Sequence, residues 1–99
     1  MGDNMISGGW KINPELVEKV TGSIPPEYLA LFDEALDGYC GSGFVPLLYC
    51  GSQLVAGMNY MFIAKQTVVL STPEYHVVKM VIHKPLDGKA KLGQIEPLL

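Results

Sequence analysis

Two cysteines and two histidines are the residues of this chain best suited to chemistry. Cys40 and Cys50 each precede a Gly-Ser pair, and His76 and His83 follow in the second half. Structural zinc sites usually contain closely spaced ligand pairs such as Cys-x-x-Cys, and no two of these residues are spaced in that way. An odd separation also points two strand histidines to opposite faces of a sheet. The pattern favours free thiols packed as small apolar groups over a metal site.

The acidic residues and the glycines form no other reactive pattern. Asp33 and Glu34 are adjacent within a helical pattern, so they face different ways and indicate a solvated surface rather than an acid–base pair. No glycine-rich loop follows a strand and opens a helix, which a nucleotide site would require. We therefore expect no catalytic residue, no metal and no cofactor, and we expect the chain not to be an enzyme.

Composition limits the class of protein further. The 99 residues indicate one domain over residues 1–99, and 48% hydrophobic residues are too many for a disordered chain. The net charge is −3 and arginine is absent, which argues against nucleic-acid binding. No apolar stretch is long enough for a membrane span, and the acidic, glycine-rich start does not resemble a signal peptide. We expect a cytoplasmic protein with no membrane partner, whose cysteines are free thiols.

One amphipathic segment predicts the main helix. Its apolar residues recur at helical spacing, while Glu27 and Asp33 face the other way, and Gly38 is placed to end the helix. A shorter helix is predicted from Asn13 to Gly22, followed by a break and a second capping residue at Ser23. The predicted apolar stripe of the main helix is Tyr28, Leu31, Phe32, Ala35, Leu36 and Tyr39.

Four apolar segments predict strands at residues 44–52, 58–71, 75–84 and 89–96. The turns between them are predicted at 54–57, 72–74 and 85–88, and Asp87-Gly88 is a strong hairpin signal. Strand 75–84 is apolar on both faces, so the pattern leaves open which face meets the helix. Consecutive strands joined by short turns form an antiparallel meander, which with the helix predicts an α+β domain.

The first predicted turn has an unusual composition. Hairpin turns favour Asn, Asp, Gly and Pro, but residues 54–56 are Leu-Val-Ala, followed by Gly57. Glycine can take a positive φ without steric cost, which a tight turn requires. An exposed apolar tip is unfavourable in water unless it contacts a partner. The alternative is that residues 54–56 continue a buried strand and that the chain turns elsewhere.

The segment Gln-Leu-Val-Ala-Gly at residues 53–57 resembles the Gln-x-Val-x-Gly motif of the cystatin family of protease inhibitors. The continuation through Asn59-Tyr60 is also similar to that family. Residues 5–9, Met-Ile-Ser-Gly-Gly, resemble the N-terminal segment of the stefins, the cystatins without signal peptide or disulfides. The resemblance implies a cystatin-like antiparallel sheet of four to five strands wrapped around one main α-helix, with residues 1–9 as a flexible arm.

The resemblance also implies a function: reversible, tight-binding inhibition of papain-like cysteine proteases of the cathepsin type. The arm and two hairpin loops would form an apolar wedge that fills the active-site cleft. Pro85-Leu86 resembles the Leu-Pro of the second stefin loop in inverted order. The implied protease-binding residues are Ile6, Ser7, Gly8, Gly9, Gln53, Leu54, Val55, Ala56, Gly57, Pro85 and Leu86.

Two hypotheses about the function stay open at this point: protease inhibition and a non-inhibitory interaction. The same fold could serve as a non-inhibitory protein-interaction or oligomerisation module. We expect a monomer, with domain swapping through the first hairpin as a route to dimers, because long apolar strands joined by a strained turn favour strand exchange.

Overall fold

The computed structural model describes residues 9–12 and 24–99. The predicted short helix from Asn13, the predicted cap Ser23 and residues 1–8 of the predicted arm lie outside this part. The described elements, in chain order, are β1 (Trp10–Ile12), α2 (Pro26–Leu36), β2 (Ser42–Val55), β3 (Gly57–Val68), β4 (Glu74–Lys84) and β5 (Lys91–Pro97).

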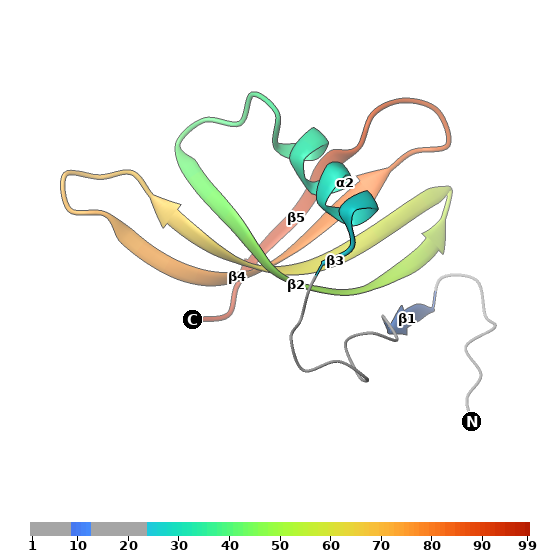
Figure 1. The fold of residues 1–99 in the computed structure, drawn as a ribbon, viewed down its shortest axis with the longest axis horizontal. Helices are drawn as coiled ribbons and strands as arrows, with labels where there is room; N and C mark the ends of the chain where they lie inside the picture. The colour runs from blue at the N-terminus through green and yellow to red at the C-terminus, as the bar shows by residue number, and fades with distance from the viewer. Residues whose placement is uncertain (1–8, 13–23) are drawn as a thin grey trace.

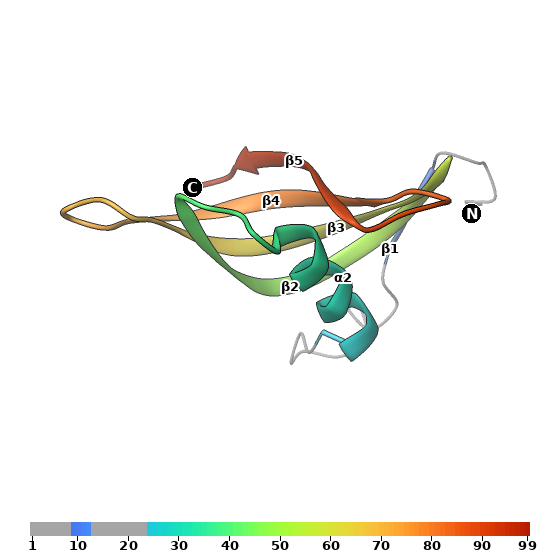
Figure 2. The same cartoon turned by 90° about the horizontal axis from the view of Figure 1, so that it is seen from above.

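The strands form one antiparallel sheet in the order β1-β2-β3-β4-β5. The sheet is curled, and α2 lies on its concave face (Figure 1). Seen from above, the axis of α2 runs across the direction of the strands (Figure 2). The predicted α+β class, a cystatin-like antiparallel sheet around one main helix, is confirmed. In the described part of the chain, no helix has the length and apolar character to cross a membrane.

Helix α2 is held to the sheet by its apolar stripe. Phe32 is only 1% exposed, and its ring meets Phe62 of β3 edge-on at 5.1 Å between centroids. Tyr28 stacks on Tyr49 of β2 at 3.9 Å, while Asp33 on the opposite face of the helix is exposed. Such aromatic pairs contribute beyond the area they bury, so the helix and the sheet form one core.

The helix is shorter than the pattern predicted at its C-terminus. It ends at Leu36, and Gly38 follows with φ +80°, the conformation expected of a glycine that ends a helix. Tyr39 was predicted in the buried stripe, but it lies beyond the helix, is exposed, and meets the ring of Phe44 edge-on at 5.4 Å. The N-cap is Pro25, which provides no side-chain cap.

The structure decides which face of β4 meets the helix. Val78, Met80 and Ile82 are fully buried in the core that contains Phe32 and Phe62. We call the opposite side of the sheet the outer face. On it, Lys79 of β4 forms an ion pair with Glu96 of β5, with 3.0 Å between Nζ and Oε1.

The strands depart most from the prediction in three respects. β2 runs on to Val55, beyond the predicted end at residue 52, because the hairpin after it is very tight. β3 ends at Val68 instead of residue 71, since the exposed residues 69–73 form the turn to β4. β1 was not predicted at all; its three residues pair with Gly51–Gln53 at the edge of β2.

Both cysteines are free, and their surroundings predict different reactivities. Cys40 is exposed, whereas burial raises the pKa of the half-buried Cys50 thiol, which its hydrogen bond with the backbone of Ile63 only partly offsets. A raised pKa leaves less thiolate at a given pH, and the thiolate is the reactive form.

At pH 8, iodoacetamide should therefore modify Cys40 first. Peptide mass spectrometry over time checks this, and faster labelling of Cys50 would contradict the packing.

Candidate protein-binding edge

The described parts of the predicted site segments lie at one end of the sheet, which we call the loop end. It comprises the β2–β3 turn, the β4–β5 connection and residue 9, which precedes β1. Both connections lie at the same end in Figures 1 and 2, and the β3–β4 turn lies at the opposite end. Trp10 is the register partner of Gln53, so β1 brings the chain alongside the first turn. The exposed Gly9 is described, whereas Ile6, Ser7 and Gly8 lie outside the described residues.

The β2–β3 turn is tighter than the predicted loop. Gln53, Leu54 and Val55 are the last residues of β2, and only Ala56 separates them from Gly57, the first residue of β3. Leu54 is 55% exposed and Ala56 is also exposed, while Val55 is half-buried. The chain does turn at the predicted place, so the alternative of a buried strand running through residues 54–56 is wrong.

Gly57 lies where the two loops touch. Its φ is +95°, a value that side-chain-bearing residues rarely adopt. A Cβ atom added there would overlap the carbonyl oxygen of Lys84 and lie 2.9 Å from Cα of Pro85. The absence of a side chain at Gly57 therefore has two effects. It permits the turn, and it allows the first turn to pack directly on the backbone at the start of the second loop.

The second loop is anchored at both of its ends. The Lys84 ammonium donates a hydrogen bond to the carbonyl oxygen of Gly88 across the loop. The buried Ala90 donates its backbone N–H to Oε1 of Glu34 on α2 at 2.9 Å. Between these anchors, Leu86 is 85% exposed, so the loop presents an apolar side chain from a restrained backbone.

Three polar side chains join neighbouring strands directly beneath both loops: Gln53, Asn59 and His83, which we call the polar row. Asn59 Nδ2 donates to Gln53 Oε1 at 2.9 Å, and Asn59 Oδ1 lies 2.8 Å from His83 Nδ1. Asn59 lies on the outer face, because it is an odd number of residues from the inward-facing Phe62. The sequence pattern favoured His83 as a strand histidine without a metal-binding or catalytic role. The strand register, which aligns the three residues, was the missing signal.

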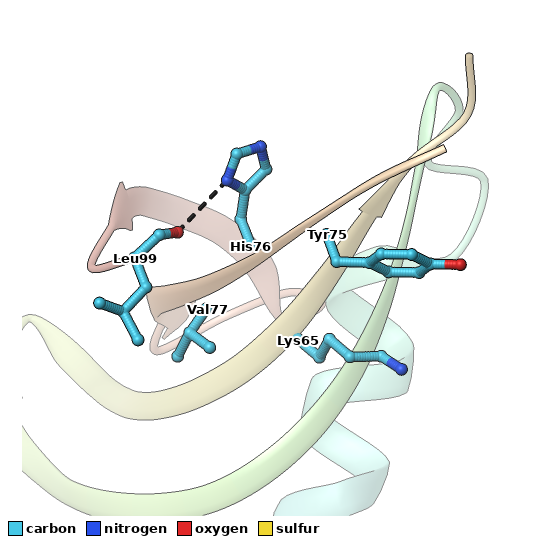
Figure 3. A pocket seen from close by; sticks show the side chains of 5 residues that line it. All are labelled: Lys65, Tyr75, His76, Val77 and Leu99. Atoms are coloured by element: carbon cyan, nitrogen blue, oxygen red, sulfur yellow. Dashed lines mark hydrogen bonds between the residues drawn. The ribbon is translucent and has the colours of Figure 1, made fainter. Parts of the chain in front are cut away.

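A shallow hollow of about 160 Å³ lies away from the loop end (Figure 3). Its lining is mainly apolar, and His76 contributes Nδ1, 3.3 Å from the backbone oxygen of Leu99. His76 Nε2 is also 3.5 Å from Oε1 of Glu74. Within residues 9–12 and 24–99, no three His, Cys, Asp or Glu side chains gather closely enough to hold a metal ion. The lining residues are Lys65, Tyr75, His76, Val77 and Leu99.

No protein-family profile, no curated protein and no solved structure matches this chain.

Proposed function

We propose that this protein is a reversible, tight-binding inhibitor of papain-like cysteine proteases, acting by obstruction of the active-site cleft. The observation that carries the proposal is an exposed apolar hairpin tip, Leu54 and Ala56, beside the exposed Leu86 of a second restrained loop. These loops coincide with the Gln-x-Val-x-Gly segment and with Pro85-Leu86.

The physics of this edge suits a wedge. A few apolar side chains that enter a desolvated pocket carry most of the free energy of a protein interface. Loops that are already fixed lose little conformational entropy on docking. Here Gly57 packs on the backbone of Lys84 and Pro85, and the Ala90–Glu34 hydrogen bond ties the second loop to the helix. The edge is therefore pre-organised to enter a cleft as a unit.

The arm would complete the wedge. The pairing of Trp10 with Gln53 directs the preceding residue, Gly9, to the same edge as the first turn. Ile6 and Ser7 would then occupy substrate pockets of the protease, with Gly8 and Gly9 allowing close approach of the backbone. Obstruction of this kind needs no reactive group in the inhibitor, and no bond of the inhibitor is broken.

A second candidate function is a non-inhibitory protein-interaction or oligomerisation module. One observation favours it: Val69 and Leu70, in the turn at the opposite end of the sheet, are 72% and 51% exposed. Apolar side chains at that end could also contact a partner.

Two matched substitutions test which end of the sheet binds the protease. Leu54→Asp and Leu70→Asp place the same charge at residues of similar exposure, 55% and 51%, at opposite ends of the sheet. If the loop end enters the protease, Leu54→Asp should weaken papain inhibition at least ~100-fold, since a carboxylate must be desolvated in an apolar cleft. Leu70→Asp should inhibit like the parent, because its side chain stays in solvent. Inhibition constants measured under reducing conditions check both expectations.

The reverse result would assign the protease-binding edge to the opposite end of the sheet. If Leu70→Asp abolishes inhibition and Leu54→Asp does not, the loop end is not the binding edge. If the parent leaves papain fully active at ~10 µM, a concentration that reveals even weak binding, the inhibitor proposal fails.

A further inference from the structure

The polar row connects the two loops beneath their tips. Gln53 precedes the Leu54–Ala56 tip directly, and His83 is separated from Pro85 only by Lys84. Asn59, between them on β3, bonds to both. A residue of the polar row therefore lies one or two positions before each loop. Any sliding of β2 relative to β4 would stretch the hydrogen bonds of the row.

The hydrogen-bond chemistry of the row fixes its members in one arrangement. Asn59 directs its amide N–H toward Gln53 Oε1 and its carbonyl oxygen toward His83 Nδ1. Rotating the Asn59 amide would keep both bonds only if the Gln53 amide also rotated and His83 changed its tautomer. Since the carbonyl oxygen can only accept, His83 must carry its proton on Nδ1. Every donor in this pair of bonds meets an acceptor, and a satisfied network specifies a single geometry.

We propose that Asn59 and His83 are positioning residues, which set the relative placement of the two loops and thereby the affinity of the edge for a protease. This inference deepens the proposed function, and its consequence for binding rests on it. The residues need not contact the protease, because they lie on the outer face below the tips. Gly57 contacts the second loop through its backbone alone. The polar row provides the side-chain link between the loops, across β2, β3 and β4.

Two substitutions at His83 isolate the hydrogen bond. His83→Leu removes the donor. His83→Asn restores a donor N–H at the same number of bonds from the backbone as Nδ1. We expect His83→Leu to weaken papain inhibition about tenfold, the size of a typical coupling between contacting residues, and His83→Asn to stay within about twofold of the parent. The melting temperatures of both variants should lie within a few degrees of the parent's, as is usual for substitutions at half-exposed strand positions.

A double-mutant cycle with the second loop tests positioning directly. If His83 acts by positioning Leu86 against the protease, the His83→Leu substitution should hardly affect inhibition once Leu86→Ala has removed the Leu86 contact. We therefore expect the tenfold effect of His83→Leu to shrink below about twofold in the Leu86→Ala background. A merely structural role would give the same loss in both backgrounds. Equal losses, or full inhibition by His83→Leu, would overturn the proposal.

Amide hydrogen exchange provides a readout that does not depend on inhibition. Loss of the link should raise exchange at residues 86–90 in His83→Leu and leave it unchanged in His83→Asn, because local opening follows the loss of restraining contacts. If the parent fails to inhibit papain, the proposed function falls, and exchange alone decides the positioning claim. Unchanged exchange in His83→Leu would then refute it, and raised exchange would uphold it.

Discussion

Gly57→Val should destabilise the fold by about 3 kcal/mol, through the sum of backbone strain and steric overlap. The strain arises because valine would have to adopt φ +95°. The overlap arises because its Cβ would collide with the Lys84 carbonyl and press on Pro85. To relieve it, the second loop must move away from the first, so papain inhibition should also be lost. Urea unfolding followed by circular dichroism measures the first effect, and an inhibition assay measures the second.

Two other glycines separate strain from overlap. Gly38 has φ +80°, but nothing lies within 4 Å of an added Cβ, so Gly38→Val tests strain alone and should cost about 1–2 kcal/mol. Gly43 has neither a positive φ nor a close neighbour, and its substitution by valine should be near neutral. Neither change should affect inhibition. If Gly57→Val is as mild as Gly38→Val, the two loops do not pack together as described.

Phe62→Ala should destabilise the protein by about 3–5 kcal/mol, the usual cost of truncating a buried aromatic side chain. Phe62 is fully buried, and its ring lies 5.1 Å from that of Phe32 on α2 and 5.4 Å from that of Tyr49 on β2. Removing it would leave a cavity between the helix and the sheet. Because small domains are stable by only about 5–15 kcal/mol, much of the variant should unfold on mild heating, which calorimetry would detect.

An exposed aromatic residue provides the control. Tyr75 is 64% exposed on the outer face, where its ring lies 5.4 Å from Nζ of Lys65. Tyr75→Ala should change the free energy of unfolding by about 0.5 kcal/mol or less. Similar losses in both variants would contradict the placement of the core between α2 and the concave face of the sheet.

The fold was largely predictable because its main elements carry local signals. The stripe from Tyr28 to Ala35 has the period of a helix, and Asp87-Gly88 marks a hairpin whose Gly88 has φ +118°. β1 gave no such signal, because three residues acquire strand geometry only through pairing with Gly51–Gln53. In β2, register shifts near Leu47 and Cys50 break the alternation that a sequence pattern relies on.

The candidate site was predictable in part for the same reason. Gly57 stood out from its sequence context, yet its contact with Lys84 and Pro85 arises between residues distant in the chain. His83 had no local feature that linked it to the first turn. Its role follows from the register that aligns it with Asn59, and apolar residues on both faces of β4 hid that register from the sequence.

The most direct test of obstruction is calorimetric binding to two forms of papain. In one form only the catalytic thiol is capped by a small group, and the cleft stays open. In the other, a covalently attached peptide fills the cleft. The account predicts tight one-to-one binding to the open form and no detectable binding to the filled form. Equal binding to both forms, or binding to neither, would contradict the proposal that the loop end occupies the active-site cleft.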